Sequence, residues 1–194
     1  MATIRILLAF ICFASIGSSV MPDRHLLSAP SVLAAHVVAP LRGVAQSPLL
    51  PILPLALAEL GVRELSGNND GPRVETYLAA VGLKKGQPWC AAFVSWVYQQ
   101  AGYPKPRTGW SPALFPASQL VKKSKPGVVF GIYYPELKRI GHCGFVVSLT
   151  PNWLLTVEGN TNGGGSRDGD GVYRKRRHVK AVHAYADWRT KTDD

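Results

Sequence analysis

The chain has 194 residues, of which 46% are hydrophobic and 18% are charged. These shares are ordinary for a globular protein and exclude a chain that is disordered throughout. The length is sufficient for one compact domain with a hydrophobic core, together with a tail. The 19 glycines and 15 prolines predict many loops.

The charge is positive overall and unevenly distributed. The formal net charge is +10 at pH 7. From Lys84 to Lys191 the sequence holds 17 of the 22 Lys and Arg residues but only 5 of the 12 Asp and Glu residues, a local balance of +12. Such a field favours an anionic partner, which is a nucleic acid, a lipid surface or an acidic wall polymer.

Residues 1–20, MATIRILLAFICFASIGSSV, have the plan of a secretory signal peptide. One early cation, Arg5, precedes a short apolar core at 6–13, and small residues follow at 14–19. The apolar core is too short for a comfortable membrane span. We expect cleavage near residues 17–20, and an uncleaved membrane anchor is the alternative.

Residues 21–53 are rich in Ala, Pro, Leu and Ser and have no steady hydrophobic period, which predicts a linker. We expect the folded domain to occupy residues 54–190. Cys12 lies in the signal segment, so the mature chain would keep Cys90 and Cys143. Two cysteines are too few for a disulfide framework, although a single bridge between them is an alternative.

The first half of the domain predicts three helices. LALAELGVREL at 55–65 suits a short helix. A second helix is expected from Pro72, with apolar residues at helical spacing up to Gly82. A third begins near Trp89 and ends near Gly102. Because this third segment is apolar on nearly every face, we expect it to be the buried central helix.

The second half predicts strands. Four β-branched or aromatic runs are separated by turn-forming segments, at residues 127–134, 142–150, 153–160 and 172–179. Helices followed by a series of strands indicate an α+β domain, with an antiparallel sheet packed against one principal helix.

Cys90 is the first candidate for chemistry, because it lies at the start of the predicted buried helix. The unpaired N–H groups and the positive dipole end of a helix favour a thiolate there. A cysteine hydrolase also needs a histidine within hydrogen-bond reach and a polar group that orients the histidine.

His142 opens a predicted strand, and the next strand carries Glu158 and Asn160 on one face. A two-residue turn at Pro151 would place His142 and Glu158 on opposite faces, whereas a longer loop of odd length would place them on the same face. Proline disfavours the tight primed turns. We therefore predict the longer loop and a shared face for His142, Glu158 and Asn160, with His142 opposite Asn160 or Asn162.

The neighbours of His142 lead to two further expectations. Gly141 and Gly144 would leave room for a substrate to approach. Cys143 alternates with His142, so we expect it on the opposite face of the strand, buried as a packing residue and away from Cys90.

Other interpretations stay open for these residues. Cys90 could be a packing residue at a helix start, or half of a disulfide with Cys143. His142 could be structural. A zinc site of Cys90, Cys143, His142 and His178 lacks the ligand spacing of known zinc motifs. The run RKRRH at 174–178 could bind nucleic acid, but runs of like charge are more often a solvated face.

Three segments, in this order, resemble the CHAP domain, the cysteine- and histidine-dependent amidohydrolase/peptidase of the papain-like, NlpC-related clan of cell-wall hydrolases. They are GQPWCAAFVSWV (86–97), GHCGFVVS (141–148) and VEGNTNGGGSRDGDGVYRKRR (157–177). The resemblance covers about residues 55–177. The sequence departs from the family in two places, since an acidic residue is missing near Val128 and Cys143 stands where an aliphatic residue is expected.

The resemblance implies a papain-like fold, in which N-terminal helices and a central helix carrying Cys90 pack on the antiparallel sheet. It implies that Cys90 is the nucleophile, His142 the general base and Glu158 the orienting residue, with Asn160 assisting. We add Gln87, together with the helix N-terminal amides, as the expected oxyanion donors.

The expected function is that of a secreted peptidoglycan hydrolase, periplasmic or extracellular, which needs no cofactor or metal. Its partners would be peptidoglycan and the anionic wall surface, with no nucleic acid and no membrane span after signal cleavage. A catalytically inert wall-binding module on the same fold is the alternative.

Overall fold

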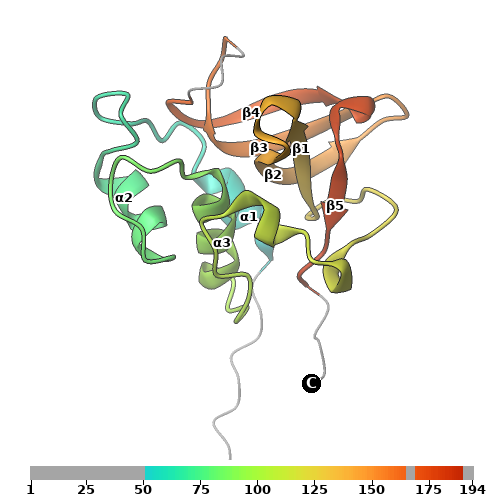
Figure 1. Cartoon of the computed structure of the whole chain (residues 1–194), viewed down its shortest axis with the longest axis horizontal. Coiled ribbons are helices and arrows are strands. Elements are labelled where there is room, and N and C mark those ends of the chain that lie inside the picture. The colour runs from blue at the N-terminus through green and yellow to red at the C-terminus, as the bar shows by residue number, and fades with distance from the viewer. Residues whose placement is uncertain (1–50, 165–168, 190–194) are drawn as a thin grey trace, which may run out of the picture. The chain divides into compact units, whose positions relative to one another are not determined.

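The computed structural model describes residues 51–164 and 169–189. The predicted signal peptide (1–20) and nearly all of the predicted linker (21–53) lie outside these residues, as does the middle of the glycine-rich loop (165–168). In the described part, helices come first and strands follow, which is the α+β arrangement that the sequence predicts (Figure 1).

Three α-helices precede the sheet, namely α1 (Ile52–Ala58), α2 (Pro72–Ala79) and α3 (Cys90–Gln100). The first helix is shorter than predicted. It ends at Ala58, and Gly61 soon follows with a φ of +92°, a left-handed conformation that ends helices. Only the first part of the predicted 55–65 segment is therefore helical.

The other two helices follow the prediction closely. Pro72 occupies the first turn of α2, where its missing N–H group costs no hydrogen bond. Gly82 and Gly102 come after α2 and α3 with φ angles of +71° and +86°. Both glycines thus turn the chain away from a helix, as predicted.

The sheet has five antiparallel strands in the order β4-β3-β2-β1-β5. The strands are β1 (Val129–Tyr134), β2 (Arg139–Leu149), β3 (Trp153–Thr161), β4 (Gly171–His178) and β5 (Ala184–Ala186). Four of them were predicted. The fifth was missed because three residues are too few to show an alternating pattern.

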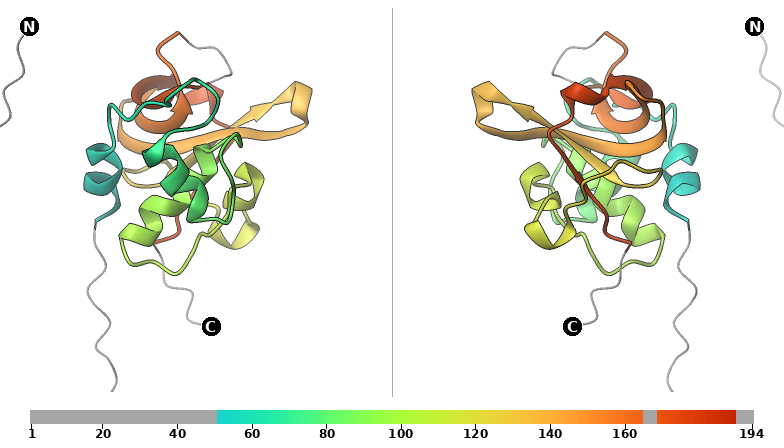
Figure 2. Two further views of the ribbon diagram at one scale, coloured as in Figure 1. Left: turned by 90° about the vertical axis from the view of Figure 1, so that its left-hand side faces the viewer. Right: turned by 90° about the vertical axis from the view of Figure 1, so that its right-hand side faces the viewer.

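The hydrophobic residues form two clusters, one on each face of the sheet. The larger cluster contains Phe145 and Val157 together with most of α3. The smaller one contains Phe130 and Val146 on the opposite face. Figure 2 shows α2 and α3 on the same side of the sheet, so the larger cluster lies between these helices and the strands.

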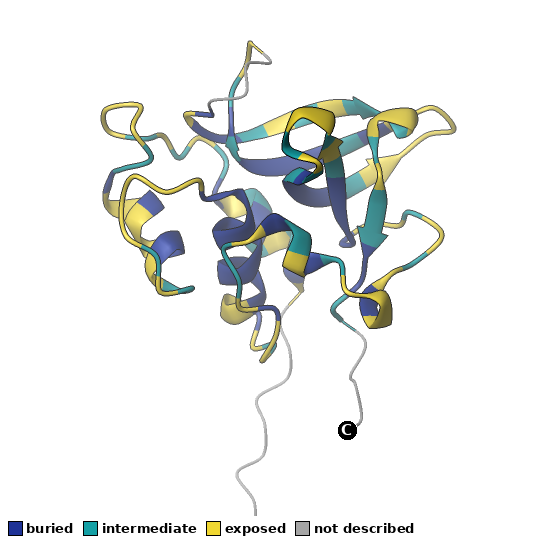
Figure 3. Ribbon diagram, viewed as in Figure 1, coloured by how far each residue is buried: buried dark blue, intermediate teal, exposed yellow. Residues whose placement is uncertain are grey.

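Helix α3 is the most buried helix of the described part. Every residue from Cys90 to Tyr98 is buried, and the helix is dark blue over most of its length in Figure 3. The prediction of a buried central helix is confirmed. Its N-terminal residue therefore lies in surroundings with little water.

The connection between β2 and β3 contradicts one prediction. The Thr150 N–H group donates a hydrogen bond of 2.8 Å to the Trp153 carbonyl oxygen, so Pro151 and Asn152 form a two-residue connection. The longer loop that we expected is wrong. A side chain also supports the connection, because the Trp153 N–H group donates to Oγ1 of Thr150 at 3.2 Å.

The predicted register nevertheless forms, because a β-bulge supplies the shift. The pairing of β2 with β3 shifts between Val146 and Ser148, and beyond that point Phe145 pairs with Val157. The extra residue is Val147. The register that places His142 and Glu158 on one face therefore comes from a bulge in β2 and not from the loop between β2 and β3.

The close packing of β3 on α3 is testable at Gly159. A Cβ atom at this position would lie 2.7 Å from Cζ3 of Trp89 and 2.8 Å from Cβ of Phe93. Both aromatic residues are fully buried and cannot easily move. We predict that Gly159→Ala lowers the free energy of unfolding by about 1–3 kcal/mol in urea denaturation.

Gly163→Ala is the matched control, because no described atom lies within 4 Å of a Cβ atom there. Its free energy of unfolding should stay within about 0.5 kcal/mol of the parent value. Equal stability of the two variants would contradict the packing described here.

Candidate active site

Cys90 is the first residue of α3 and only 5% of its surface is exposed. Its position is fixed by the preceding residue, since the fully buried Trp89 donates from Nε1 to Oε1 of Glu64 at 2.8 Å. The N–H groups of the first helical turn have no intrahelical acceptors, which favours negative charge at this end. The local structure therefore suits a thiolate.

His142 and Glu158 lie on one face, as the sequence predicts. Nε2 of His142 is 2.8 Å from Oε2 of Glu158, and both side chains are buried. With Nε2 occupied in this way, Nδ1 is the ring nitrogen left to exchange a proton with a nucleophile. Glu158 thus fixes both the orientation and the tautomer of the imidazole.

The Glu158 carboxylate has two further partners that the sequence analysis did not identify. Arg177 on β4 binds it through two hydrogen bonds, from Nε to Oε1 at 2.9 Å and from Nη2 to Oε2 at 2.6 Å. Thr156 donates from Oγ1 to Oε1 at 2.5 Å. Thr156 lies two residues before Glu158 in β3, so strand alternation could have revealed it.

The glycines around His142 do not leave space for a substrate, which corrects our expectation. A Cβ atom at Gly144 would lie 2.8 Å from Cγ of Glu158, and one at Gly141 would lie 2.3 Å from Cδ2 of Tyr134. The protein's own side chains fill both positions. Gly144 is required because the Glu158 side chain passes over it towards His142.

The pKa values of the Cys90 thiol and the His142 imidazole are coupled to each other. The neighbouring Cys143 thiol is the largest influence on Cys90. Acting against burial and together with His142, it holds the pKa of Cys90 well below its usual value. Burial alone would lower the pKa of His142, but Cys90 and Glu158 outweigh it and raise this pKa to about 9. Both shifts favour the thiolate–imidazolium form of the pair over the neutral form.

Cys143 is buried as predicted, but it does not lie away from Cys90. It belongs to the core cluster that contains α3, and its thiol interacts with that of Cys90. The prediction that Cys143 and His142 point to opposite faces is confirmed, because β2 stays paired with β1 at both residues. Cys143 packs with α3, whereas the His142 ring packs against Phe130 of the smaller cluster. The two cysteines are free thiols.

Two more residues belong to the surroundings of the Cys90 sulfur. Oγ of the buried Ser111 lies 3.4 Å from Sγ of Cys90. Burial, together with the nearby charges of Cys90 and Glu158, raises the pKa of Tyr134 despite the opposing effect of Arg177. Neither residue carries a signal in the sequence, since Ser111 begins a short 3-10 helix and Tyr134 is the last residue of β1.

The two remaining predicted site residues are not joined to this cluster. Asn160 has a φ of +53° and lies where the pairing of β3 with β4 becomes irregular. Gln87 is exposed in the loop before α3. Among the described residues, no hydrogen bond connects either side chain to Cys90, His142 or Glu158.

Comparison of the chain with protein-family models and with curated proteins gave no match. The chemistry of the Cys90 cluster, and the sequence motifs that supply it, are therefore what indicate a function.

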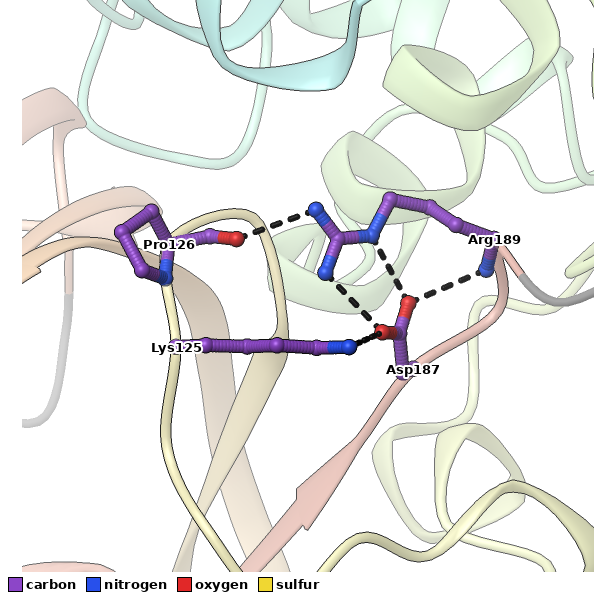
Figure 4. Close-up of a pocket in the computed structure, with 4 residues that line it drawn as sticks. All are labelled: Lys125, Pro126, Asp187 and Arg189. Carbon is purple, nitrogen blue, oxygen red and sulfur yellow. Dashed lines mark hydrogen bonds and ion pairs between the residues drawn. The ribbon is translucent and has the colours of Figure 1, made fainter.

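A pocket elsewhere on the described chain is structural in character. It is lined by Lys125, Pro126, Asp187 and Arg189 (Figure 4). The buried Asp187 accepts from Nε of Arg189 at 2.8 Å and pairs with Nζ of Lys125 at 2.9 Å. Arg189 also donates to the carbonyl oxygen of Pro126 at 3.0 Å. These contacts fasten the segment after β5 to the loop before β1.

Residues 51–164 and 169–189 show neither a metal site nor a membrane-spanning helix. No group of three or more His, Cys, Asp or Glu side chains there could hold a metal ion. No helix in these ranges combines the length and apolarity needed to cross a bilayer.

The ion pair predicts how Cys90 reacts with iodoacetamide. Because its pKa is lowered by Cys143 and His142, the alkylation rate should reach its plateau at a lower pH than that of an ordinary thiol. In His142→Gln the rate should fall at pH 7 and rise with pH towards the range of an ordinary thiol. Mass spectrometry of the Cys90 peptide over a pH series measures both profiles, and identical profiles would contradict the pairing.

The arginine on Glu158 predicts a loss of stability. Arg177→Met leaves a buried carboxylate without its main cation, so the free energy of unfolding at pH 7 should fall by about 3 kcal/mol. Glu158 has its pKa lowered from 4.5 to about 2, chiefly by Arg177 and His142 acting against burial. The deficit should therefore be complete above pH 4.5 and shrink as the pH falls towards 2.

Arg176→Met is the control for this experiment. Arg176 precedes Arg177 on β4 but is exposed, and its guanidinium lies 4.2 Å from the ring centroid of Trp153. Its loss should change the free energy of unfolding by no more than about 1 kcal/mol. A deficit in Arg177→Met that does not depend on pH would contradict the role given to Glu158.

Proposed function

We propose that the protein is a secreted, papain-like cysteine hydrolase that cleaves an amide bond in peptidoglycan. The observation that carries the proposal is the 2.8 Å contact between His142 and Glu158, formed beside a thiol at the N-terminus of a buried helix. A nucleophile, a base and an orienting carboxylate in this relation are what acyl transfer needs.

In the proposed reaction the Cys90 thiolate attacks the carbonyl carbon of the amide. The C–N bond breaks, the His142 imidazolium gives its proton to the leaving amine, and a thioester on Cys90 remains. A water molecule then attacks the thioester, with neutral His142 accepting its proton. The C–S bond breaks, the carboxylic acid leaves, and the Cys90 thiolate and the His142 imidazolium are restored. Glu158 keeps the imidazole aligned through both steps and stabilises its charged form.

The negative charge on the substrate oxygen needs donors during both attacks. We assign this role to the N–H groups of the first turn of α3 and to the side chain of Gln87, which lies in the exposed loop before Cys90. Asn160 would assist the orientation of His142 once substrate is bound. Both assignments come from the sequence pattern.

Peptidoglycan is proposed as the substrate because the segments around Cys90, His142 and Glu158 resemble those of CHAP domains. The positive balance between Lys84 and Lys191 adds support, since it would concentrate the protein on an anionic wall. Salt should weaken that attraction. The bond cut is either within the stem peptide or between the peptide and the sugar.

The proposal is tested with purified peptidoglycan. Cys90→Ala and His142→Ala should each lower the rate of wall degradation by about 10³-fold or more, because each removes a group that acts in the chemical step. His183→Ala is the control, since this histidine packs on Tyr133 and has no part in the proposed reaction. Circular dichroism and urea unfolding establish that the variants fold.

The products identify the bond, since mass spectrometry of the released fragments distinguishes an amidase from an endopeptidase. Full activity in Cys90→Ala would overturn the proposal. Wall binding by the parent protein without any release of fragments would favour the inert module instead.

A further inference from the structure

We propose that Cys90 and Cys143 are a redox pair in which a hydroperoxide oxidises Cys90, Cys143 closes a disulfide, and a thiol reductant reopens it. As a regulatory device this rests on the proposed function, because it would switch the nucleophile off. The thiol chemistry itself does not depend on which substrate the protein cleaves.

The fold places the two thiols together from different elements. Cys90 begins α3, and Cys143 lies on the face of β2 that packs against this helix, in the same core cluster. Oγ of Ser111 lies 3.4 Å from Sγ of Cys90, and the pKa values of the two thiols are coupled to each other and to Ser111. Both are free.

Exposure assigns the two cysteines different roles. Cys90 keeps 5% of its surface exposed, whereas Cys143 has none. A small oxidant can therefore reach Cys90, while Cys143 can only react with a group already inside the protein. The pKa of Cys143 agrees with these different roles. Burial and the Cys90 charge raise this pKa, which favours a neutral thiol at Cys143.

The chemistry balances in two steps. The Cys90 thiolate attacks one oxygen of hydrogen peroxide, the O–O bond breaks, and the products are Cys90 sulfenic acid and, after protonation, water. The Cys143 sulfur then attacks the sulfenic sulfur, the S–O bond breaks, and the Cys143 proton leaves with the hydroxide as a second water. An external dithiol returns two electrons and two protons and restores both thiols.

The consequence is protection as well as inhibition. A nucleophilic cysteine beside an aliphatic residue would proceed from sulfenic to sulfinic acid, which thiols do not reduce. Cys143 packs in the same core cluster as Cys90, so disulfide formation would compete with attack by a second peroxide. Oxidation would then cost activity only until reductant returns.

The experiment uses the full chain carrying Cys12→Ser, which leaves Cys90 and Cys143 as its two cysteines. It is treated with hydrogen peroxide in excess and then digested without reduction. We expect a monomer that has lost two hydrogens, a cross-linked pair of peptides containing Cys90 and Cys143, and full return of both thiols with dithiothreitol. Sulfinic acid at Cys90 beside a free Cys143, a disulfide between molecules, or two unmodified thiols would each overturn the proposal.

Cys143→Val and Cys143→Ser, in the same background, test the protective role. In both variants peroxide should carry Cys90 to sulfinic acid, and dithiothreitol should restore less than about a tenth of its reactivity with iodoacetamide. Recovery equal to that of the parent would count against the pair. These experiments measure masses and thiol counts, which do not depend on wall degradation. If the disulfide forms but the protein degrades no peptidoglycan, the proposed function is refuted and the redox pair is not.

Discussion

The buried carboxylate of Glu158 is the constraint on which the site depends. A carboxylate with no exposed surface is costly unless charged and polar partners replace water. Arg177, Thr156 and His142 do so, and they come from β4, β3 and β2. The order β4-β3-β2 is therefore what allows one charge to be buried, and Gly144 on β2 provides the space for its side chain.

The effect of Glu158 extends to the thiol through the imidazole. A carboxylate on Nε2 stabilises the protonated ring, and a protonated ring stabilises a thiolate near Nδ1. The influence is mutual, because the thiolate also raises the pKa of His142. Close packing of β3 on α3 at Gly159 keeps Cys90 near this pair. Packing and electrostatics thus act on the same few residues.

The sequence predicted the elements better than their pairing. The apolar run of α3 and the four longer strands were identifiable from hydrophobic pattern alone. The predicted register between β2 and β3 is correct, but the reason given for it was wrong. The register shift comes from a bulge at Val147 and not from a longer loop at Pro151. A bulge without Gly leaves no local signal. The contact of Arg177 with Glu158 could not be predicted, because Arg177 is one of several cations at 174–178. Only the pairing of β4 with β3 distinguishes it from the exposed Arg176.

Cys143 shows what alternation along a strand can and cannot predict. Alternate side chains of a paired strand point to opposite faces, and β2 stays paired with β1 at both His142 and Cys143. Cys143 accordingly packs in the core cluster of α3, whereas the His142 ring packs against Phe130 of the other cluster. Both residues nevertheless affect the pKa of Cys90, so alternation did not predict how near Cys143 lies to Cys90. One short segment of β2 thus supplies the proposed base and a second thiol. Any change in the backbone there would alter the basicity of the site and its response to oxidants together.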